Sequence, residues 1–127
     1  MSAPLVLVVD DDPDILEAIS DILEVEGYRV ARARHGAEAL ERVDVERPAV
    51  ILLDLMMPVM DGVTFAQRLR ARPAFSDLPI VVISADGNRQ RAAPVGAAGY
   101  LAKPFDVDSL LSWVARLCAE RPGASPA

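Results

Sequence analysis

Three uninterrupted apolar runs constrain the fold of this chain more than any other feature. They are "LVLVV" at Leu5–Val9, "AVILL" at Ala49–Leu53 and "IVVI" at Ile80–Ile83, and all three are rich in β-branched side chains. A strand with one wet face alternates apolar and polar residues, so an unbroken run predicts a strand buried on both faces. Such strands are typical of parallel sheets that are covered by helices on both sides.

Two weaker strands and several helices complete the pattern. Tyr28–Ala33 ("YRVARA") alternates, which predicts a strand with one wetter face at a sheet edge, and Gly99–Ala102 is a candidate fifth strand. Apolar residues recur with a helical period between the strands, in segments 15–26, 37–43, 65–69 and 107–118. Strands that alternate with helices predict the α/β class. We expect a doubly wound, flavodoxin-like parallel sheet of five strands, with five helices on its two faces.

Residues that stop or start helices lie at the ends of these segments. Gly27 follows the first helix, and Pro48 and Pro73 follow the second and third. Asp106 is placed to cap the last helix, which we expect to end before Pro122.

The segment between the fourth and fifth strands predicts an atypical helix. It reads "SADGNRQRAAPVGAAG" from Ser84 to Gly99, with Gly87 near its start and few large apolar residues. Pro94 disfavours the helical conformation at the residue before it. We therefore expect a short fourth helix of about two turns, at 88–93.

Composition narrows the class of protein. The chain has 127 residues, 52% of them hydrophobic, and a formal net charge of -6. This charge argues against a nucleic-acid or anionic-membrane surface and favours a cation or a basic partner. Cys118 is the single cysteine, and no apolar stretch approaches the ~20 residues of a membrane helix. With no signal-peptide pattern, we expect a soluble, cytoplasmic domain over 1–121 and a tail or linker stub over 122–127.

Polar residues follow the buried strands. The first run ends in Asp10, Asp11 and Asp12, the second in Asp54, the third in Ser84, and the weak fifth strand in Lys103 and Pro104. The carboxyl ends of parallel strands meet at one edge of the sheet, which is where such folds bind ligands. We expect three or four carboxylates, one hydroxyl and one ammonium to gather there.

Carboxylates with few softer ligands suit a hard divalent cation, Mg²⁺ or Mn²⁺. His35 and Cys118 are poorly placed to join them, which disfavours zinc. An aspartate is also a competent nucleophile toward phosphoryl groups, and a lysine and a metal ion can neutralise the phosphoryl oxygens. Helix capping explains one of the three consecutive acids, Asp12 before Pro13, but not all three.

Four blocks of sequence together resemble the receiver domains of two-component response regulators. They are "VLVVDDDPDI", "ILLDLMMPVMDG", "VVISA" and "GYLAKPF", in that order, between residues 5 and 105. The resemblance implies that Asp54 accepts a phosphoryl group from a histidine kinase or a phosphotransfer protein. It also implies that Asp11 binds Mg²⁺ directly, Asp10 through water, and Met56 through its backbone carbonyl, while Lys103 pairs with the phosphate.

The same resemblance implies a conformational switch and positions that tune it. Ser84 would move toward the phosphate, Tyr100 would turn inward, and a cis peptide bond would precede Pro104. The face made by the fourth helix, fifth strand and fifth helix would then change its affinity for a downstream protein. Met56 and Asp86 lie where the family adjusts the lifetime of the phosphate, although the direction of their effect cannot be read from the sequence.

Two other functions compete with this interpretation. The atypical fourth helix favours an interaction module that does not use phosphorylation, whereas the complete acidic pocket opposes that alternative. A phosphohydrolase of the haloacid dehalogenase type would need a second acid two residues after its nucleophile, where this chain has Met56. We therefore expect self-catalysed phosphorylation and slow hydrolysis only.

Trp113 lies off the apolar stripe of the last helix. This position leaves open whether its side chain is exposed and contacts a partner.

Overall fold

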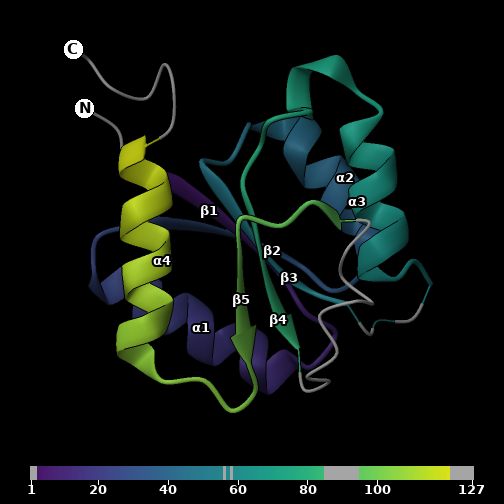
Figure 1. Ribbon diagram of the computed structural model, residues 1–127. Helices are drawn as coiled ribbons and strands as arrows, with labels where there is room; N and C mark the ends of the chain where they lie inside the picture. The colour runs from purple at the N-terminus through teal and green to yellow at the C-terminus, as the bar shows by residue number, and fades with distance from the viewer. Residues whose placement is uncertain (1–2, 56, 58, 85–94, 121–127) are drawn as a thin grey trace.

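A five-stranded parallel sheet forms the centre of the computed structural model, which describes residues 3–55, 57, 59–84 and 95–120 (Figure 1). The strands are β1 (Leu5–Val9), β2 (Arg29–Ala33), β3 (Val50–Asp54), β4 (Ile80–Ser84) and β5 (Gly99–Ala102). Their order is β2-β1-β3-β4-β5, and every neighbouring pair is parallel. This order places the topological switch point between β1 and β3. It also makes β2 an edge strand, as its alternating sequence predicts.

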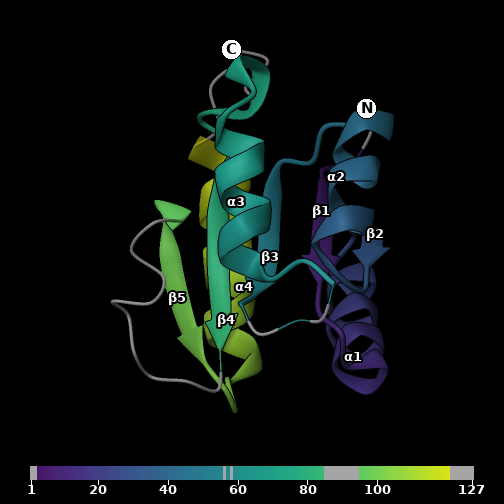
Figure 2. The ribbon, with the colours of Figure 1, turned by 90° about the vertical axis from the view of Figure 1, so that its right-hand side faces the viewer.

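Helices cover both faces of the sheet. The structure describes α1 (Pro13–Val25), α2 (Gly36–Val45), α3 (Gly62–Arg70), α4 (Val107–Glu120) and a short 3₁₀ turn, η1 (Pro73–Phe75). Helices α1 and α4 lie on one face, and α2 and α3 lie on the other, as the two views show (Figures 1 and 2). The predicted doubly wound, flavodoxin-like fold is confirmed. The predicted helix at 88–93 falls outside the described residues.

The apolar runs are continuous because each strand feeds two cores. Within β3, Ile51 and Leu53 pack with α2 and α3, whereas Val50 and Leu52 pack with α1 and α4. All five residues of β3 are buried, and so are all five of β4. Successive side chains of a strand point to opposite faces, so a sheet with two covered faces needs apolar residues at every position.

The strands continue one residue past the apolar runs. Asp54 pairs with Ile83, and Ser84 pairs with Ala102, so both polar residues are the last members of their strands. The prediction started the second strand at Tyr28 and the third at Ala49, whereas β2 begins at Arg29 and β3 begins at Val50. Ladder pairing, which depends on the neighbouring strand, overrides the local change of polarity.

The ends of the helices follow the predicted capping. The side chain of Asp12 accepts a hydrogen bond from the backbone N–H of Asp14, and Pro13 is the first residue of α1. Gly27 has a φ of 93°, a left-handed conformation that favours glycine, just after α1 ends. Asp106 accepts a 2.6 Å hydrogen bond from the N–H of Ser109 in the first turn of α4. Within the described residues, no helix is long and apolar enough to cross a membrane.

Trp113 is half-buried rather than free at the surface. Its indole ring packs against the start of β5, where a Cβ added to Gly99 would lie 2.6 Å from the ring. The guanidinium of Arg116 lies over the ring, 5.4 Å from its centroid. Trp113 therefore covers the end of an edge strand, which the apolar stripe of α4 alone does not reveal.

Candidate functional site

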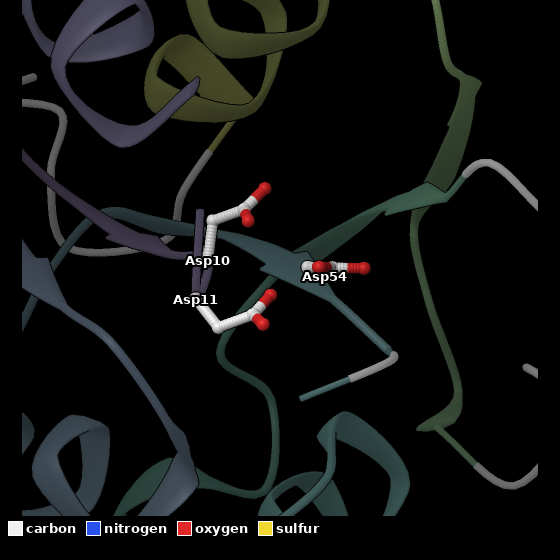
Figure 3. A group of neighbouring side chains, drawn as sticks. All are labelled: Asp10, Asp11 and Asp54. Atoms are coloured by element: carbon white, nitrogen blue, oxygen red, sulfur yellow. The ribbon is translucent and has the colours of Figure 1, made fainter. Parts of the chain in front are cut away.

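Three aspartates converge at the switch point of the sheet. Asp10 and Asp11 project from the end of β1 toward the end of β3, where Asp54 lies (Figure 3). One carboxylate oxygen from each of the three lies within 4.8 Å of the others. Asp10 and Asp54 are buried, with 2% and 6% of their surface exposed, whereas Asp11 is exposed. The acidic cluster is therefore open to solvent on the side of Asp11, whereas its other two carboxylates are buried.

The three consecutive acids have two structural roles: Asp10 and Asp11 belong to the acidic cluster, and Asp12 caps α1. The N–H of Asp10 donates to the carbonyl of Ala33, which ties the residue after β1 to the last residue of β2. Its carboxylate in turn accepts a 2.9 Å hydrogen bond from the N–H of Asp12. Asp12 caps α1 and stays outside the cluster of three, so the cap and the acidic cluster coexist in one short turn.

Lys103 brings a positive charge to the cluster from the end of β5. Its Nζ lies 3.0 Å from Asp10 Oδ2 and 3.6 Å from Asp54 Oδ2. Burial alone would lower the pKa of this ammonium, but the hydrogen bond and charge of Asp10, together with the charge of Asp54, outweigh burial and raise the pKa. Lys103 therefore stays protonated and neutralises part of the acidic charge.

Backbone contacts fix where the Lys103 side chain begins. The N–H of Lys103 donates to the carbonyl of Ser84 at 2.9 Å, which ties the end of β5 to the end of β4. The peptide bond between Lys103 and Pro104 is cis, as the resemblance predicts. Lys103 and Ser84 therefore lie at the ends of adjacent strands, and β4, which ends in Ser84, is next to β3, which ends in Asp54.

The structure describes both predicted switch residues, Ser84 and Tyr100. Ser84 ends β4 with 6% of its surface exposed, on the strand next to Asp54. Tyr100 is half-buried in β5 and packs against the core under α2 and α3. Their switching roles stay predictions, and Met56 and Asp86 fall outside the described residues. His35 caps α2 through a hydrogen bond from the N–H of Glu38.

The donor set fits a hard divalent cation. Among the described residues, the acids Asp10, Asp11 and Asp54 form the one group of three side chains with metal-ligating spacing, and all their donors are oxygen. Three carboxylates against the single ammonium of Lys103 leave a net negative charge that a divalent ion would balance. Mg²⁺ binds through one or two carboxylates and keeps several waters, which suits a cluster with one exposed side.

A hollow that the sequence alone does not reveal lies beside Lys103. It has a volume of about 410 Å³ and an almost entirely apolar lining from α1 and from the connection between β5 and α4. The lining residues are Ile15, Ala18, Ile19, Lys103, Pro104 and Phe105. Phe105, directly after the predicted Lys103 and Pro104, was the available signal.

Comparison with known proteins agrees with this geometry. Residues 6–115 match the response regulator receiver domain family. The transcriptional regulatory protein PrrA of Mycobacterium tuberculosis is 41% identical over 124 residues, which cover 95% of this chain and 52% of PrrA. The chain therefore spans about half the length of this curated relative.

Solved structures agree as well. A putative response regulator from Chloroflexus aurantiacus superposes with a TM-score of 0.86 at 34% identity, covering 94% of this chain and 100% of that one. The receiver domain of the sensor histidine kinase PA1611 from Pseudomonas aeruginosa, solved with magnesium coordinated in its active-site cleft, gives 0.87 at 30% identity, with coverages of 94% and 100%. The chain belongs to the receiver domain family of two-component response regulators.

Proposed function

We propose that Asp54 accepts a phosphoryl group from a phosphohistidine on a histidine kinase or a phosphotransfer protein. One observation carries the proposal: the buried carboxylate of Asp54 lies 3.6 Å from the ammonium of Lys103 and beside the carboxylates of Asp10 and Asp11. A carboxylate is a competent phosphoryl acceptor when nearby positive charge offsets the repulsion between the two anions.

The transfer is a displacement at phosphorus. An oxygen of Asp54 forms a bond to phosphorus while the phosphorus–nitrogen bond of the donor breaks, and the imidazole nitrogen keeps the electron pair. The phosphoryl oxygens gain the ammonium of Lys103 as a partner, and the hydroxyl of Ser84 donates a hydrogen bond to one of them. Fixed charges and donors around the transferred group are the main source of catalysis in such reactions.

Asp10, Asp11 and Asp54 would hold Mg²⁺ or Mn²⁺, with the backbone carbonyl of Met56 and water as further ligands. When bound, the ion neutralises charge on the transferring phosphoryl group. Asp10 already accepts a hydrogen bond from Lys103 at 3.0 Å, which supports its acting on the ion through water while Asp11 binds it directly.

Phosphorylation would bias an equilibrium between two conformations of the domain. Ser84 moves toward the phosphate, Tyr100 turns inward, and the face around β5 and α4 changes its affinity for a downstream protein. Met56 and Asp86 tune the lifetime of the phosphate. Hydrolysis of the acyl phosphate by water regenerates Asp54, so the domain catalyses its own phosphorylation and dephosphorylation and turns over no other substrate.

The apolar hollow beside Lys103 is our proposed docking point for the phosphodonor. Ile15 and Ala18 on α1 and Phe105 next to Lys103 offer apolar surface within reach of the acidic cluster. A partner helix seated there would bring its phosphohistidine to Asp54. The acidic residues Asp14 and Glu17 on the exposed side of α1 favour a donor with basic residues around its histidine.

We further propose that the domain works in the cytoplasm through protein contacts, without direct binding of nucleic acid or membrane, since its net charge is -6. The buried Asp54 beside Lys103 supports phosphoryl acceptance over an interaction module that does not use phosphorylation. Asp54→Asn separates the two, because it would leave the partner binding of such a module and its regulation unchanged.

The test is intact-mass spectrometry after incubation with acetyl phosphate and Mg²⁺. The wild-type protein should gain the mass of one phosphoryl group, and it should gain none when the metal is chelated. Asp54→Asn should abolish the gain, whereas Asp108→Asn, which changes an exposed aspartate in the first turn of α4, should leave it intact. A wild-type protein that gains no mass while a known receiver domain does so would overturn the proposal.

A further inference from the structure

The connection that leaves β3 closes back on itself at Gly62. The N–H of Gly62 donates a 3.0 Å hydrogen bond to the carbonyl of Leu55, the residue after Asp54. Gly62 is buried and is also the first residue of α3. The first turn of α3 therefore sits directly on the backbone at the end of the strand that carries Asp54.

There is no room for a side chain at position 62. A Cβ added to Gly62 would lie 2.7 Å from the carbonyl oxygen of Asp54 and 2.8 Å from the Cα of Leu55. Real Cβ contacts are almost never closer than 3.0 Å, and the two nearest atoms are backbone, which cannot rotate away. A larger residue would therefore have to separate α3 from the end of β3 by several tenths of an ångström.

Such a shift bears on the acidic cluster because its members come from different strands. Asp10 and Asp11 follow β1, and Asp54 ends β3, so the distances between their carboxylates depend on where the end of β3 lies. The carboxylate of Asp54 is attached directly to the backbone that Gly62 contacts. We propose that Gly62 is a positioning residue for Asp54: its missing side chain lets α3 hold Asp54 at the spacing that binds the divalent cation.

This role differs from simply starting a helix. The capping of α3 is supplied by Asp61, whose carboxylate accepts a 2.8 Å hydrogen bond from the N–H of Thr64. If Gly62 only allowed the helix to begin, its replacement would lower stability and leave metal affinity unchanged in the folded protein. The part of the inference that concerns phosphoryl transfer rests on the proposed function, whereas the part that concerns metal binding does not.

Gly99 provides a matched control. A Cβ there would lie 2.6 Å from the ring of Trp113, an overlap with a side chain rather than with backbone, at the opposite end of the sheet from the acidic cluster. Gly99→Ala should therefore destabilise the protein without moving Asp54.

A stabilised parent guards against a variant that does not fold. Val59 has a φ of 68° and is 81% exposed, so Val59→Gly should relieve backbone strain without removing a buried contact. Gly62→Ala is made in the wild type and in Val59→Gly. If Gly62→Ala acts only through stability, the Val59→Gly background should restore Mn²⁺ binding together with stability. If Gly62 positions Asp54, that background should restore stability alone.

The experiment measures Mn²⁺ binding by electron paramagnetic resonance, which counts the free ion, together with labelling by acetyl phosphate. Signals are normalised to the folded fraction from circular dichroism. We expect Gly62→Ala to weaken Mn²⁺ binding about 10-fold in both backgrounds, as changes behind metal ligands commonly do. We expect its maximal labelling rate to fall at least about 10-fold at saturating donor, because misplacement by a fraction of an ångström is costly. Gly99→Ala and Val59→Gly should bind Mn²⁺ like the wild type.

Two results would overturn the inference. One is a folded Gly62→Ala that binds Mn²⁺ as tightly as Gly99→Ala does; the other is a loss of affinity that Val59→Gly repairs. A wild-type protein that binds Mn²⁺ but takes no phosphoryl group would reject the proposed function and leave the metal-binding comparison valid.

Discussion

The ammonium of Lys103 lies 3.0 Å from a carboxylate oxygen of Asp10, although 93 positions separate the two residues in the chain. Burial would lower the pKa of Lys103, but the hydrogen bond and charge of Asp10, helped by the charge of Asp54, raise it overall. The contact therefore keeps a positive charge at the acidic cluster, where the proposed phosphoryl transfer would use it.

Lys103 is the single lysine of the chain, so its titration can be followed without overlap. In protein grown with ¹³C-lysine, we expect an NMR pH titration to give a pKa above the ordinary value of 10.5, and Asp10→Asn to lower it. Because the folded pKa is raised, the stability from this contact is complete below pH 10.5 and is lost as the pH rises through the folded pKa. An unchanged lysine pKa in Asp10→Asn would contradict this account of the ion pair.

Removal of the Ser84 hydroxyl should separate phosphorylation from its consequence. Trp113, the single tryptophan, packs on β5 at Gly99, next to Tyr100, so its fluorescence should report movement of this face. We expect Ser84→Ala to accept a phosphoryl group on Asp54 without the fluorescence change that the wild type shows. Ser84→Thr keeps a hydroxyl and should retain the change. An equal change in all three proteins would show that the hydroxyl does not drive the switch.

Val59 carries avoidable backbone strain. Its φ of 68° is left-handed, which is unfavourable for a β-branched residue, and its side chain is 81% exposed. We expect Val59→Gly to raise the free energy of unfolding in urea by about 1 kcal/mol, as the relieved strain exceeds the added chain entropy. Val25 is equally exposed but ends α1, so Val25→Gly should lower that free energy instead. A loss of stability in both variants would contradict the strain at position 59.

Asp61 caps the N-terminus of α3. Its carboxylate satisfies the N–H of Thr64 at 2.8 Å. We expect Asp61→Ala to lower the free energy of unfolding by about 1 kcal/mol, and Asp61→Asn, which still accepts a hydrogen bond, to lose much less. Urea unfolding measures both variants. Equal losses would mean that the charge of Asp61, rather than its hydrogen bond, stabilises the helix.

Much of the fold is predictable because its strands are buried on both faces. A strand between two layers of helices must be apolar at every position, so the runs that contain Val8, Leu52 and Val82 can be recognised as buried strands from the sequence. The edge strands are harder to predict, since half of each is wet, and the expected start of β2 was one residue early. The inclusion of Asp54 and Ser84 in their strands depends on pairing with Ile83 and Ala102, which the local sequence does not encode.

The site was predictable in composition but not in its contacts. Parallel strands bring their carboxyl ends together, so residues after β1, β3 and β5 could be expected at one edge. That Lys103 lies closer to Asp10 than to Asp54 depends on the heights at which three strands end, which local sequence does not encode. The approach of Gly62 to the backbone of Asp54 is equally hidden, because a glycine in a turn has many possible reasons.

The most direct test of the central claim is to find which residue holds the phosphoryl group. After labelling with acetyl phosphate and Mg²⁺, borohydride reduction converts an aspartyl phosphate to homoserine, which peptide mass spectrometry can locate. We predict homoserine at position 54 alone, and none without Mg²⁺ or in the Asp54→Asn variant. Reduction at another aspartate, or a phosphoryl group found on Ser84 or His35, would contradict the account.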